Sequence, residues 1–335
     1  MKASLEQLLD GVDLSASEAG GIMEALTDPE LSPAVSGALL AALRTKGESS
    51  EEVRGFADAM RRLAVPIVLP REGPPLVDTC GTGGDGSGSL NLSTAAGLLA
   101  AAAGARVVKH GNRSISSRAG SADVLETLGI PIHLGPEEGA KCLAAHNFVF
   151  LFAPRYHPAM AAVMPIRRAM GVRTVFNMLG PLSNPAAPPY QVVGAFSLAA
   201  AEKMAHALSG MAIERAFVVH GALGWDEATP IGPYHLFDVR SGQVTHTERD
   251  PQDVGVDRCS PTDLAGGDAA YNAAALEALL RGSEGPHQDA ACLAAGLALE
   301  VCGLADSHEE GISLARQAIS DGSAGRLLDG LRGVG

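Results

Sequence analysis

The stretch VDTCGTGGDGSGSLNLST, residues 77–94, determines the fold expected for this chain. A short apolar run leads into a glycine-rich loop, in which Gly81, Gly83 and Gly86 satisfy the pattern G-x-G-x-x-G. Glycine-rich backbone after a strand lets amide groups approach phosphate oxygens without interference from a Cβ atom, and a following helix N-terminus adds a favourable dipole. The stretch therefore predicts a strand–loop–helix unit whose loop binds a phosphorylated ligand.

The same glycine pattern occurs in dinucleotide-binding folds, but its surroundings here differ. In those folds the third glycine already lies in the helix, and an acid about 20 residues further on holds the ribose. Here the loop continues through GSGSLN, the helix is expected from Ser93, and the next strand ends in Lys109 and His110. Asp85 would also repel a pyrophosphate unless a divalent cation lies between them. The loop favours a Mg²⁺-complexed diphosphate over NAD, although a plain glycine-rich turn stays open, with ordinary helix caps at Asn91, Ser93 and Thr94.

Further strand-like runs surround this unit: ARVVKH, FVFLF, YQVVGAF and RAFVVHG, separated by alanine-rich helical stretches. Strands that alternate with helices indicate a parallel sheet, whose ligands bind at the carboxyl ends of the strands. Residues 1–65 instead read as helices, with a capping box at Ser49 and Glu52 and with Ser32, Pro33 and Gly47 bounding another helix. The expected fold class is α/β, with a small all-helical domain and a larger domain that has a mainly parallel central sheet flanked by helices.

The proline-rich segment 66–75 predicts the domain boundary. We expect a helical domain over 1–70 and an α/β domain over 71–157 and 186–335. Residues 157–170 read as another helix, and about 158–185 are expected to pack back onto the helical domain.

Composition limits the function classes. A net charge of −13 argues against a nucleic-acid partner, which would need a basic face. Five scattered cysteines without a CxxC pair predict reduced thiols. No apolar run reaches membrane length, and no basic segment followed by an apolar one begins the chain. We expect a cytoplasmic protein that acts on small molecules and contacts no membrane.

A second donor-rich loop and an acidic pair are the other candidate site elements. The segment 109–129 follows a strand with a lysine, a histidine, an arginine, an asparagine and several serines, which fits a second phosphate or a solvated loop capped by serines. Asp226 and Glu227 follow another strand, and they either share a magnesium ion with phosphate oxygens or are two solvated charges. Arg167 offers a planar fork for a carboxylate, whereas Arg168 and Arg173 fit surface or structural charges equally well.

These motifs, in their order along nearly the whole chain, resemble those of the anthranilate phosphoribosyltransferases: GTGGDG, NLST, KHGNRSISSRAGSADVLE, HPAM, IRRAMG and the late WDE. The resemblance implies an active site in the cleft between a helical and an α/β domain, and a homodimer formed through the helical domains. It implies transfer of a phosphoribosyl group from phosphoribosyl pyrophosphate (PRPP) to the amine of anthranilate in tryptophan biosynthesis. It also implies two Mg²⁺ ions per subunit.

The resemblance assigns roles to individual positions. Asp85, Lys109 and His110 would be catalytic. PRPP would be held by Gly81, Gly84, Asp85, Ser89, Asn91, Leu92, Ser93, Thr94, Lys109, His110, Gly111, Asn112, Arg113, Ser114, Ile115, Ser116, Ser117 and Ser121. Anthranilate would be bound by Gly81, Asn112, His157 and Arg167. Ser93 would help hold one Mg²⁺, and Asp226 with Glu227 the second.

Two departures from the family pattern concern the metal loop and the helix near it: Trp225 replaces a small aliphatic residue, and Ala294 stands where asparagine is frequent. The alternatives are an enzyme like the pyrimidine nucleoside phosphorylases, which share the architecture, and a non-catalytic relative that binds nucleic acid. KHGNR and IRRAMG argue against the first alternative. The intact GTGGD and the acidic net charge argue against the second.

Overall fold

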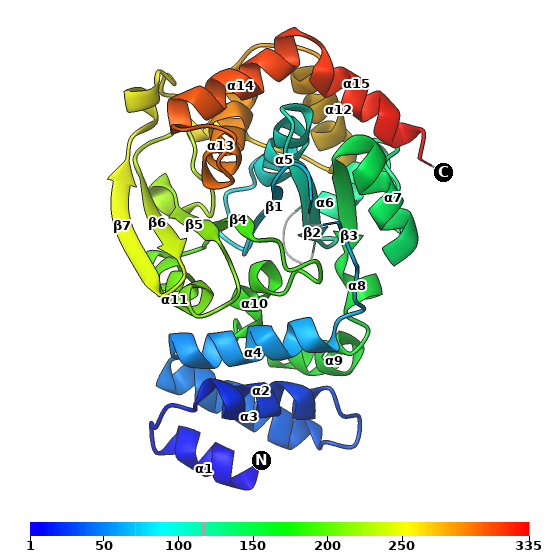
Figure 1. Ribbon diagram of the computed structural model, residues 1–335. Helices are drawn as coiled ribbons and strands as arrows, with labels where there is room; N and C mark the ends of the chain where they lie inside the picture. Colours follow the sequence, from blue (N-terminus) through cyan, green and yellow to red (C-terminus); the bar gives the residue numbers. More distant parts are fainter. Residues whose placement is uncertain (71, 115–117, 335) are drawn as a thin grey trace.

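The computed structural model describes residues 1–70, 72–114 and 118–334. An N-terminal bundle lies below a larger part built around one sheet (Figure 1). The bundle is formed by α1 (Lys2–Leu9), α2 (Ala16–Leu26), α3 (Pro33–Lys46) and α4 (Ser50–Leu63). The strands are β1 (Leu76–Gly81), β2 (Arg106–Gly111), β3 (Phe148–Phe152), β4 (Tyr190–Gly194), β5 (Arg215–His220), β6 (Tyr234–Arg240) and β7 (Gln243–Arg249).

The remaining helices connect and cover the strands. They are α5 (Leu92–Ala102), α6 (Ser121–Thr127), α7 (Pro136–His146), α8 (Ala153–Tyr156), α9 (Met160–Met170), α10 (Phe176–Leu182), α11 (Leu198–Ser209), α12 (Ala269–Leu280), α13 (Pro286–Val301), α14 (His308–Ser320) and α15 (Ser323–Arg332). Short 3-10 helices lie at η1 (Ala222–Gly224), η2 (Pro251–Val254) and η3 (Pro261–Leu264). No helix in the described ranges combines the length and hydropathy needed to cross a bilayer.

The sheet has the strand order β3-β2-β1-β4-β5-β6-β7. The first five strands of this order are parallel, and β6 and β7 add an antiparallel hairpin at one edge. The sequence prediction of an α/β fold with a mainly parallel sheet is therefore confirmed. The hairpin was not predicted, and neither was the start of α5 at Leu92, one residue before the expected one.

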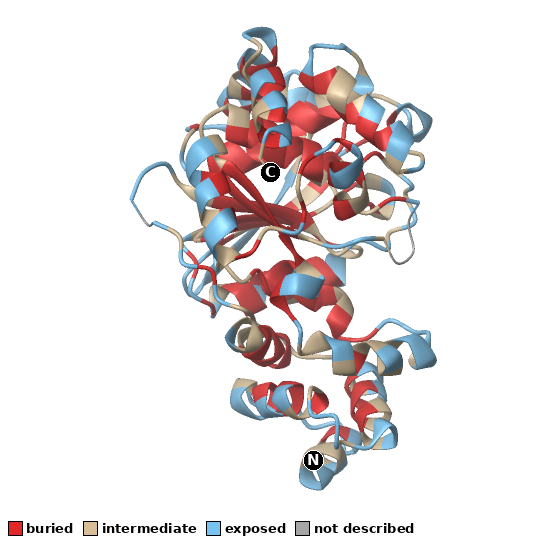
Figure 2. Ribbon diagram, turned by 90° about the vertical axis from the view of Figure 1, so that its right-hand side faces the viewer, coloured by how far each residue is buried: buried red, intermediate tan, exposed pale blue. Residues whose placement is uncertain are grey.

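Two apolar cores hold the molecule together, one on each side of the sheet (Figure 2). Successive residues of β5 show the division, because side chains alternate across a strand. Phe217 and Val219 belong to the core shared with α5 and α13, whereas Ala216 and Val218 belong to the core shared with α11 and the N-terminal bundle. The bundle is thus joined to the sheet by continuous apolar packing, with α4 nearest the sheet (Figure 1).

The bundle shows the local chemistry that the sequence predicts. The Ser49 hydroxyl accepts a bond from the Glu52 N–H at 3.2 Å, and the Glu52 carboxylate accepts one from the Ser49 N–H at 2.7 Å. A second capping box, at Ser15 and Glu18, begins α2. α9 contacts α3 and α10 contacts α4, so the segment between β3 and β4 packs on the bundle.

Candidate active site

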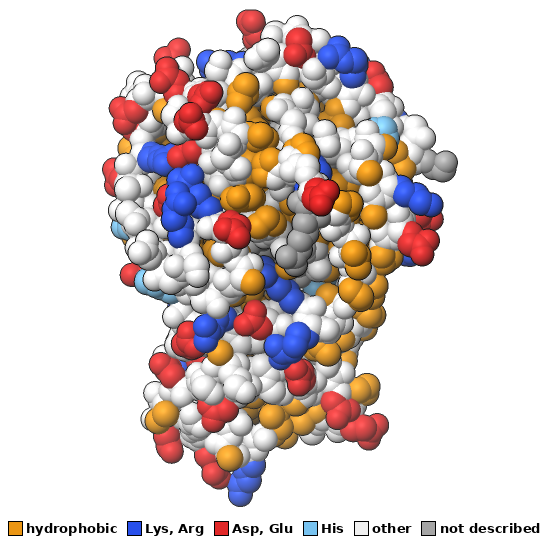
Figure 3. Space-filling view, in the orientation of Figure 1, with side chains coloured by type: hydrophobic (Ala, Val, Ile, Leu, Met, Phe, Trp, Pro, Cys, Tyr) orange, Lys and Arg blue, Asp and Glu red, His pale blue; other side chains and the backbone are white. Residues whose placement is uncertain are grey.

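The candidate residues gather where β1, β2, β4 and β5 end. Because these strands are parallel and adjacent, the loops that follow them meet at one edge of the sheet. The strand order reverses at β1, which lies between β2 and β4. Loops on the two sides of such a point diverge and leave a crevice for a ligand. On the face seen in Figure 3, basic and acidic side chains lie together at the narrowing between the bundle and the larger part.

The loop after β1 has the backbone of an anion-binding turn. Gly83, Gly84 and Gly86 all have positive φ angles, of 65°, 72° and 76°. Within the described part of the chain, the backbone N–H groups of Gly84, Asp85 and Gly86 donate to no protein acceptor. Successive free N–H groups in such a turn form a concave site for anions. The predicted phosphate loop is therefore structurally suited to a phosphate group.

Asp226 is held against this loop by close backbone approach. Its carboxylate accepts a hydrogen bond from the Gly83 N–H at 2.6 Å, and its own N–H donates to the Asp85 carboxylate at 3.2 Å. A Cβ atom on Gly81 would lie 2.6 Å from the Asp226 Oδ2, and one on Gly194 would lie 1.5 Å from the Asp226 carbonyl oxygen. Gly194 therefore leaves room for the backbone of Asp226, and Gly81 leaves room for the present orientation of its carboxylate.

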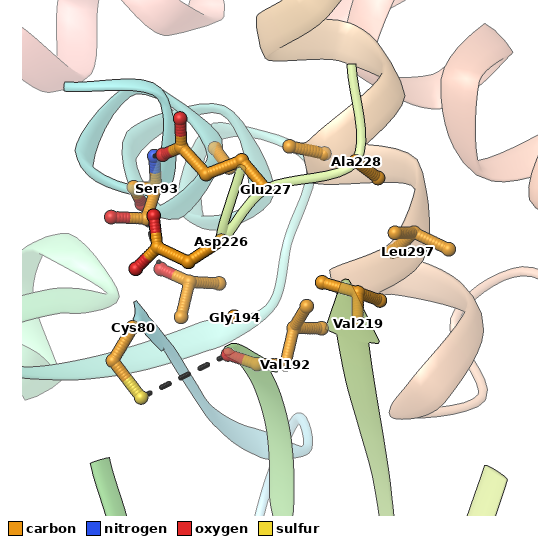
Figure 4. A pocket seen from close by; sticks show the side chains of 12 residues that line it. Cys80, Ser93, Val192, Gly194, Val219, Asp226, Glu227, Ala228 and Leu297 are labelled. Carbon is orange, nitrogen blue, oxygen red and sulfur yellow. Dashed lines mark hydrogen bonds between the residues drawn. The ribbon is translucent and has the colours of Figure 1, made fainter. Parts of the chain in front are cut away.

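Glu227 points to the first turn of α5. Its carboxylate accepts hydrogen bonds from the Ser93 N–H at 3.1 Å and from the Ser89 hydroxyl at 3.2 Å. Figure 4 shows Asp226 and Glu227 extending from one segment toward Ser93. A cavity beneath them is lined in part by Ala294 and Leu297 of α13, so the Ala294 departure leaves open space under the acidic pair. Trp225 is buried in the core.

Three carboxylates from two loops therefore converge at one place. Burial raises the pKa of Asp226, and the neighbouring Asp85 raises it further. Burial also raises the pKa of Glu227, with further contributions from Asp226 and Asp85. Such oxygen donors suit Mg²⁺, whose positive charge would offset their mutual repulsion. In the described part of the chain, no three Asp, Glu, His or Cys side chains are arranged so that they could hold a metal ion by themselves.

Lys109 lies beneath the loop. It is 2% exposed, and its ammonium donates to the Thr79 carbonyl and, at 3.3 Å, to the Ser93 hydroxyl. Burial lowers the pKa of Lys109, while nearby Asp78 opposes the shift. The amine is thus positioned at the start of α5, behind the residues that face the loop.

The loop after β2 is anchored on α6. Arg113 forms ion pairs with Asp123 and Glu126, each at 2.8 Å, and the Ser114 N–H donates to Asp123 at 3.1 Å. Because these carboxylates engage the guanidinium, Arg113 fixes the loop rather than presenting a free cation. The predicted positions Ile115, Ser116 and Ser117 lie outside the described residues.

Other predicted contacts lie around the same edge. Asn91 occupies the N-cap position of α5, but its side chain makes no capping bond. Its amide instead donates to the Ala119 carbonyl at 3.2 Å and its oxygen accepts from Asn272 at 2.9 Å, so it connects the loops after β1 and β2. Leu92 is fully buried, so only its backbone can face a ligand. Thr94 is also buried, and within the described ranges its hydroxyl has no partner. Gly111 ends β2, and the Ser121 hydroxyl donates to the Asn112 carbonyl at 3.4 Å.

Comparison with known proteins defines the family. Residues 73–325 match the model of the glycosyl transferase family a/b domain, and residues 2–64 match its helical bundle domain. The chain is 47% identical to the anthranilate phosphoribosyltransferase of Solibacter usitatus, over 96% of this chain and 94% of that protein. It is also 47% identical to that of Rubrobacter xylanophilus, over 98% and 96% of the two chains. The chain belongs to the anthranilate phosphoribosyltransferase family.

Solved structures of the family agree with this assignment. The Thermus thermophilus enzyme superposes with a TM-score of 0.92 at 42% identity, covering 99% of this chain and 98% of that one. The Saccharomyces cerevisiae enzyme, solved in complex with PRPP and Mg, superposes with a TM-score of 0.89 at 26% identity, covering 99% and 96%. The family, fold class and enzyme class predicted from the sequence are therefore confirmed.

The family residues predicted for the acceptor lie near the bundle side of the site. His110 and His157 are buried with their rings 5.1 Å apart, and the Nε2 atom of each has no partner in the described ranges. Burial lowers the pKa of His110 to about 3 and that of His157 to about 4, so both rings are neutral at physiological pH. Arg167 is half-buried, with its guanidinium 5.1 Å from the centre of the Phe176 ring and 3.9 Å from the Met164 sulfur, and it pairs with no carboxylate in the described part of the chain.

Sequence reasoning missed several residues that shape the site. Gly194 leaves room for Asp226, and the glycine within YQVVGAF could have indicated this close approach. Asn184 donates to buried Asp78 at 2.8 Å beneath the site, a pairing that no spacing reveals. Arg173 was left as a surface or structural charge, but its guanidinium contacts the glycine-rich loop at 2.5 Å.

Proposed function

We propose that this chain transfers the 5-phosphoribosyl group of PRPP to the amine of anthranilate, giving N-(5-phosphoribosyl)anthranilate and pyrophosphate in tryptophan biosynthesis. One observation carries the proposal: the turn with free N–H groups lies directly beside the carboxylates of Asp226 and Glu227. A diphosphate bound with magnesium would satisfy both at once, because the backbone N–H groups would donate to its oxygens and the carboxylates would help to hold the cation.

The reaction breaks the bond from the ribose C1 to the pyrophosphate oxygen and forms a bond from C1 to the anthranilate nitrogen. Positive charge develops on the ribose and negative charge on the leaving pyrophosphate. The N–H groups of Gly84, Asp85 and Gly86 face the developing negative charge, and preorganised donors of this kind contribute about 3 kcal/mol each in other enzymes. Anthranilate's aromatic amine is already unprotonated near neutral pH, so the site needs no strong base.

Two Mg²⁺ ions per subunit complete the proposed site. Ser93 with the ligand would hold one, and Asp226 with Glu227 the other. When bound, magnesium neutralises the leaving group's charge and orients the diphosphate. Lys109 supports the same region from below, because its ammonium fixes the Ser93 hydroxyl at the start of α5.

The acceptor would enter from the bundle side. His110 and His157, both neutral, would line the acceptor's path, and Arg167 would provide a planar cation for the anthranilate carboxylate. Gly81 and Asn112 would line the path between these histidines and the phosphate loop. The remaining positions assigned to PRPP keep the roles proposed above. Ser89 would contact PRPP directly, whereas Asn91 and Arg113 would act by holding the loops that contact it.

We also propose that the chain works as two units that close over the substrates. One unit consists of residues 1–70 and 158–185, and the other of residues 71–157 and 186–335. Closure would exclude water, which competes with anthranilate for the ribose.

A homodimer through the bundle is supported by apolar side chains exposed there, Leu9 at 69% and Val12 at 52%. Light scattering after size-exclusion chromatography tests the dimer, and Leu9→Glu with Val12→Glu should shift it to monomer. We place the enzyme in the cytoplasm.

The decisive assay follows anthranilate fluorescence and pyrophosphate release with purified protein and PRPP. Loss of fluorescence matched by equal pyrophosphate release, dependent on Mg²⁺, is the expected result. Uracil in place of anthranilate, and a reaction without acceptor, test the alternative acceptor and hydrolysis. Pyrophosphate release that does not depend on anthranilate, or consumption of uracil instead, would refute the proposal.

A further inference from the structure

Arg173 lies between α9 and α10, on the segment that packs against the bundle, yet its side chain reaches the phosphate loop. The guanidinium Nη2 donates to the Gly84 carbonyl at 2.5 Å. The same guanidinium lies over the Phe196 ring, 4.4 Å from its centre, just after the end of β4. Its backbone carbonyl accepts a bond from the Arg44 guanidinium in the last turn of α3. The residue therefore connects the bundle, the end of β4 and the glycine-rich loop.

The hydrogen bond to Gly84 determines which way one peptide group faces. The chain contains no cis peptide among its described residues, so the Gly84 carbonyl and the Asp85 N–H point in opposite directions. A carbonyl held toward Arg173 therefore directs the Asp85 N–H to the opposite side. Gly84 has a φ of 72° and is exposed, so without a partner this peptide could rotate.

Phe196 supports the same arrangement from the other side. Stacking on an aromatic ring restricts the orientation of a guanidinium, and such contacts are worth about 0.5–1 kcal/mol at exposed sites. The Phe196 N–H also donates to the Thr82 hydroxyl at 3.0 Å, which ties the ring's own position to the first residue of the loop. The Arg173 guanidinium is thus held both by the Phe196 ring and by the Gly84 carbonyl.

We propose that Arg173 is a positioning residue for the diphosphate: it sets the Gly84–Asp85 peptide so that the Asp85 N–H faces the diphosphate. This inference rests on the proposed function and adds a residue that acts through the loop rather than on the reacting atoms. It predicts that losing Arg173 weakens the binding of the diphosphate substrate and leaves the acceptor's binding unchanged.

The test compares Arg173→Ala, Arg173→Lys and Phe196→Leu with Arg168→Ala as the matched control. Arg168 is a nearby exposed arginine whose side chain makes no hydrogen bond or ion pair in the described ranges. We expect Arg173→Ala to raise the KM for PRPP roughly tenfold, in line with the loss of a charged hydrogen bond. The KM for anthranilate and the Tm should stay close to those of the wild type. Arg173→Lys keeps one donor, so its KM for PRPP should lie between those of the wild type and Arg173→Ala.

Phe196→Leu separates positioning from direct attraction, because it leaves every charge in place. A rise of about threefold in the KM for PRPP supports positioning. An unchanged KM in Phe196→Leu, or a wild-type KM in Arg173→Ala, overturns the proposal. Titration with Mg²⁺ and inorganic pyrophosphate, followed by the fluorescence of the single tryptophan Trp225, repeats the comparison without turnover. An inactive wild type would therefore refute the proposed function and still leave Arg173 tested.

Discussion

Substitution of Gly194 by alanine tests how closely Asp226 must approach the strand ends. The new Cβ would lie 1.5 Å from the Asp226 carbonyl oxygen and 2.7 Å from its carbonyl carbon. Ordinary contacts begin near 3.4 Å, so the acidic segment must move by about 2 Å. Displacement of a positioned group by about 1 Å can cost on the order of 100-fold in rate, so kcat/KM should fall at least that far.

The folding cost of Gly194→Ala should be smaller than its catalytic cost. Overpacking usually costs about 1–3 kcal/mol, and each kcal/mol lowers the Tm by roughly 2–4 °C in chains of moderate size. Gly81→Ala is the milder companion, because its Cβ meets only the end of the Asp226 side chain, which can rotate. Gly21→Ala, in the middle of α2 with nothing within 4 Å, should keep full activity and gain up to about 1 kcal/mol of stability.

The assay measures kcat and both KM values from anthranilate fluorescence, with the Tm measured on the same samples. A folded Gly194→Ala variant with wild-type kcat/KM would refute the reasoning, since Asp226 would then not need its present position. Equal losses in Gly21→Ala would show that the effect is not specific to the site.

Two further predictions concern stability. Burial lowers the pKa of His157 to about 4, whereas the pKa of an unfolded histidine is near 6.5. The neutral ring therefore contributes fully to the free energy of unfolding above about pH 6.5. This contribution is lost as the pH falls toward 4, at up to about 1.4 kcal/mol per pH unit. Between pH 7 and pH 5, urea unfolding should show a larger loss for the wild type than for His157→Gln; equal losses would contradict this. Glu52 is buried, pairs with Lys46 at 2.9 Å and accepts the Leu14 N–H, so Glu52→Gln should lower the free energy of unfolding by about 3 kcal/mol. Glu51→Gln removes a charge from the more exposed ion pair with Arg54, so it should change the free energy of unfolding by less than about 1 kcal/mol. Similar changes in the free energy of unfolding for Glu52→Gln and Glu51→Gln would disprove the role of burial.

Local sequence signals were sufficient for most of the fold. The parallel strands carry short β-branched or aromatic runs, and the helix boundaries carry capping residues such as Ser49, so their positions follow from nearest neighbours along the chain. The β6–β7 hairpin escaped prediction because β7 is largely exposed, so the apolar signal is weak. The hairpin joins the sheet through the pairing of β6 with β5, a contact between segments that no local pattern reveals.

The site was predictable as a set of motifs but not as a geometry. GTGGD and the acidic pair are visible in the sequence, whereas the contact between Gly83 and Asp226 joins residues far apart in the chain. Arg173 shows the same limit, because a surface arginine and one that orients a loop peptide look identical until the loop is placed beside it. Conversely, Arg113 looked like a free donor and is occupied by two carboxylates of α6.

The most direct test of the account is a crystal structure of this protein with PRPP and Mg²⁺ bound. The account predicts diphosphate oxygens within hydrogen-bond distance of the N–H groups of Gly84, Asp85 and Gly86, with magnesium between the diphosphate and Asp226 or Glu227. A diphosphate bound away from the loop after β1, with these N–H groups still free, would contradict it.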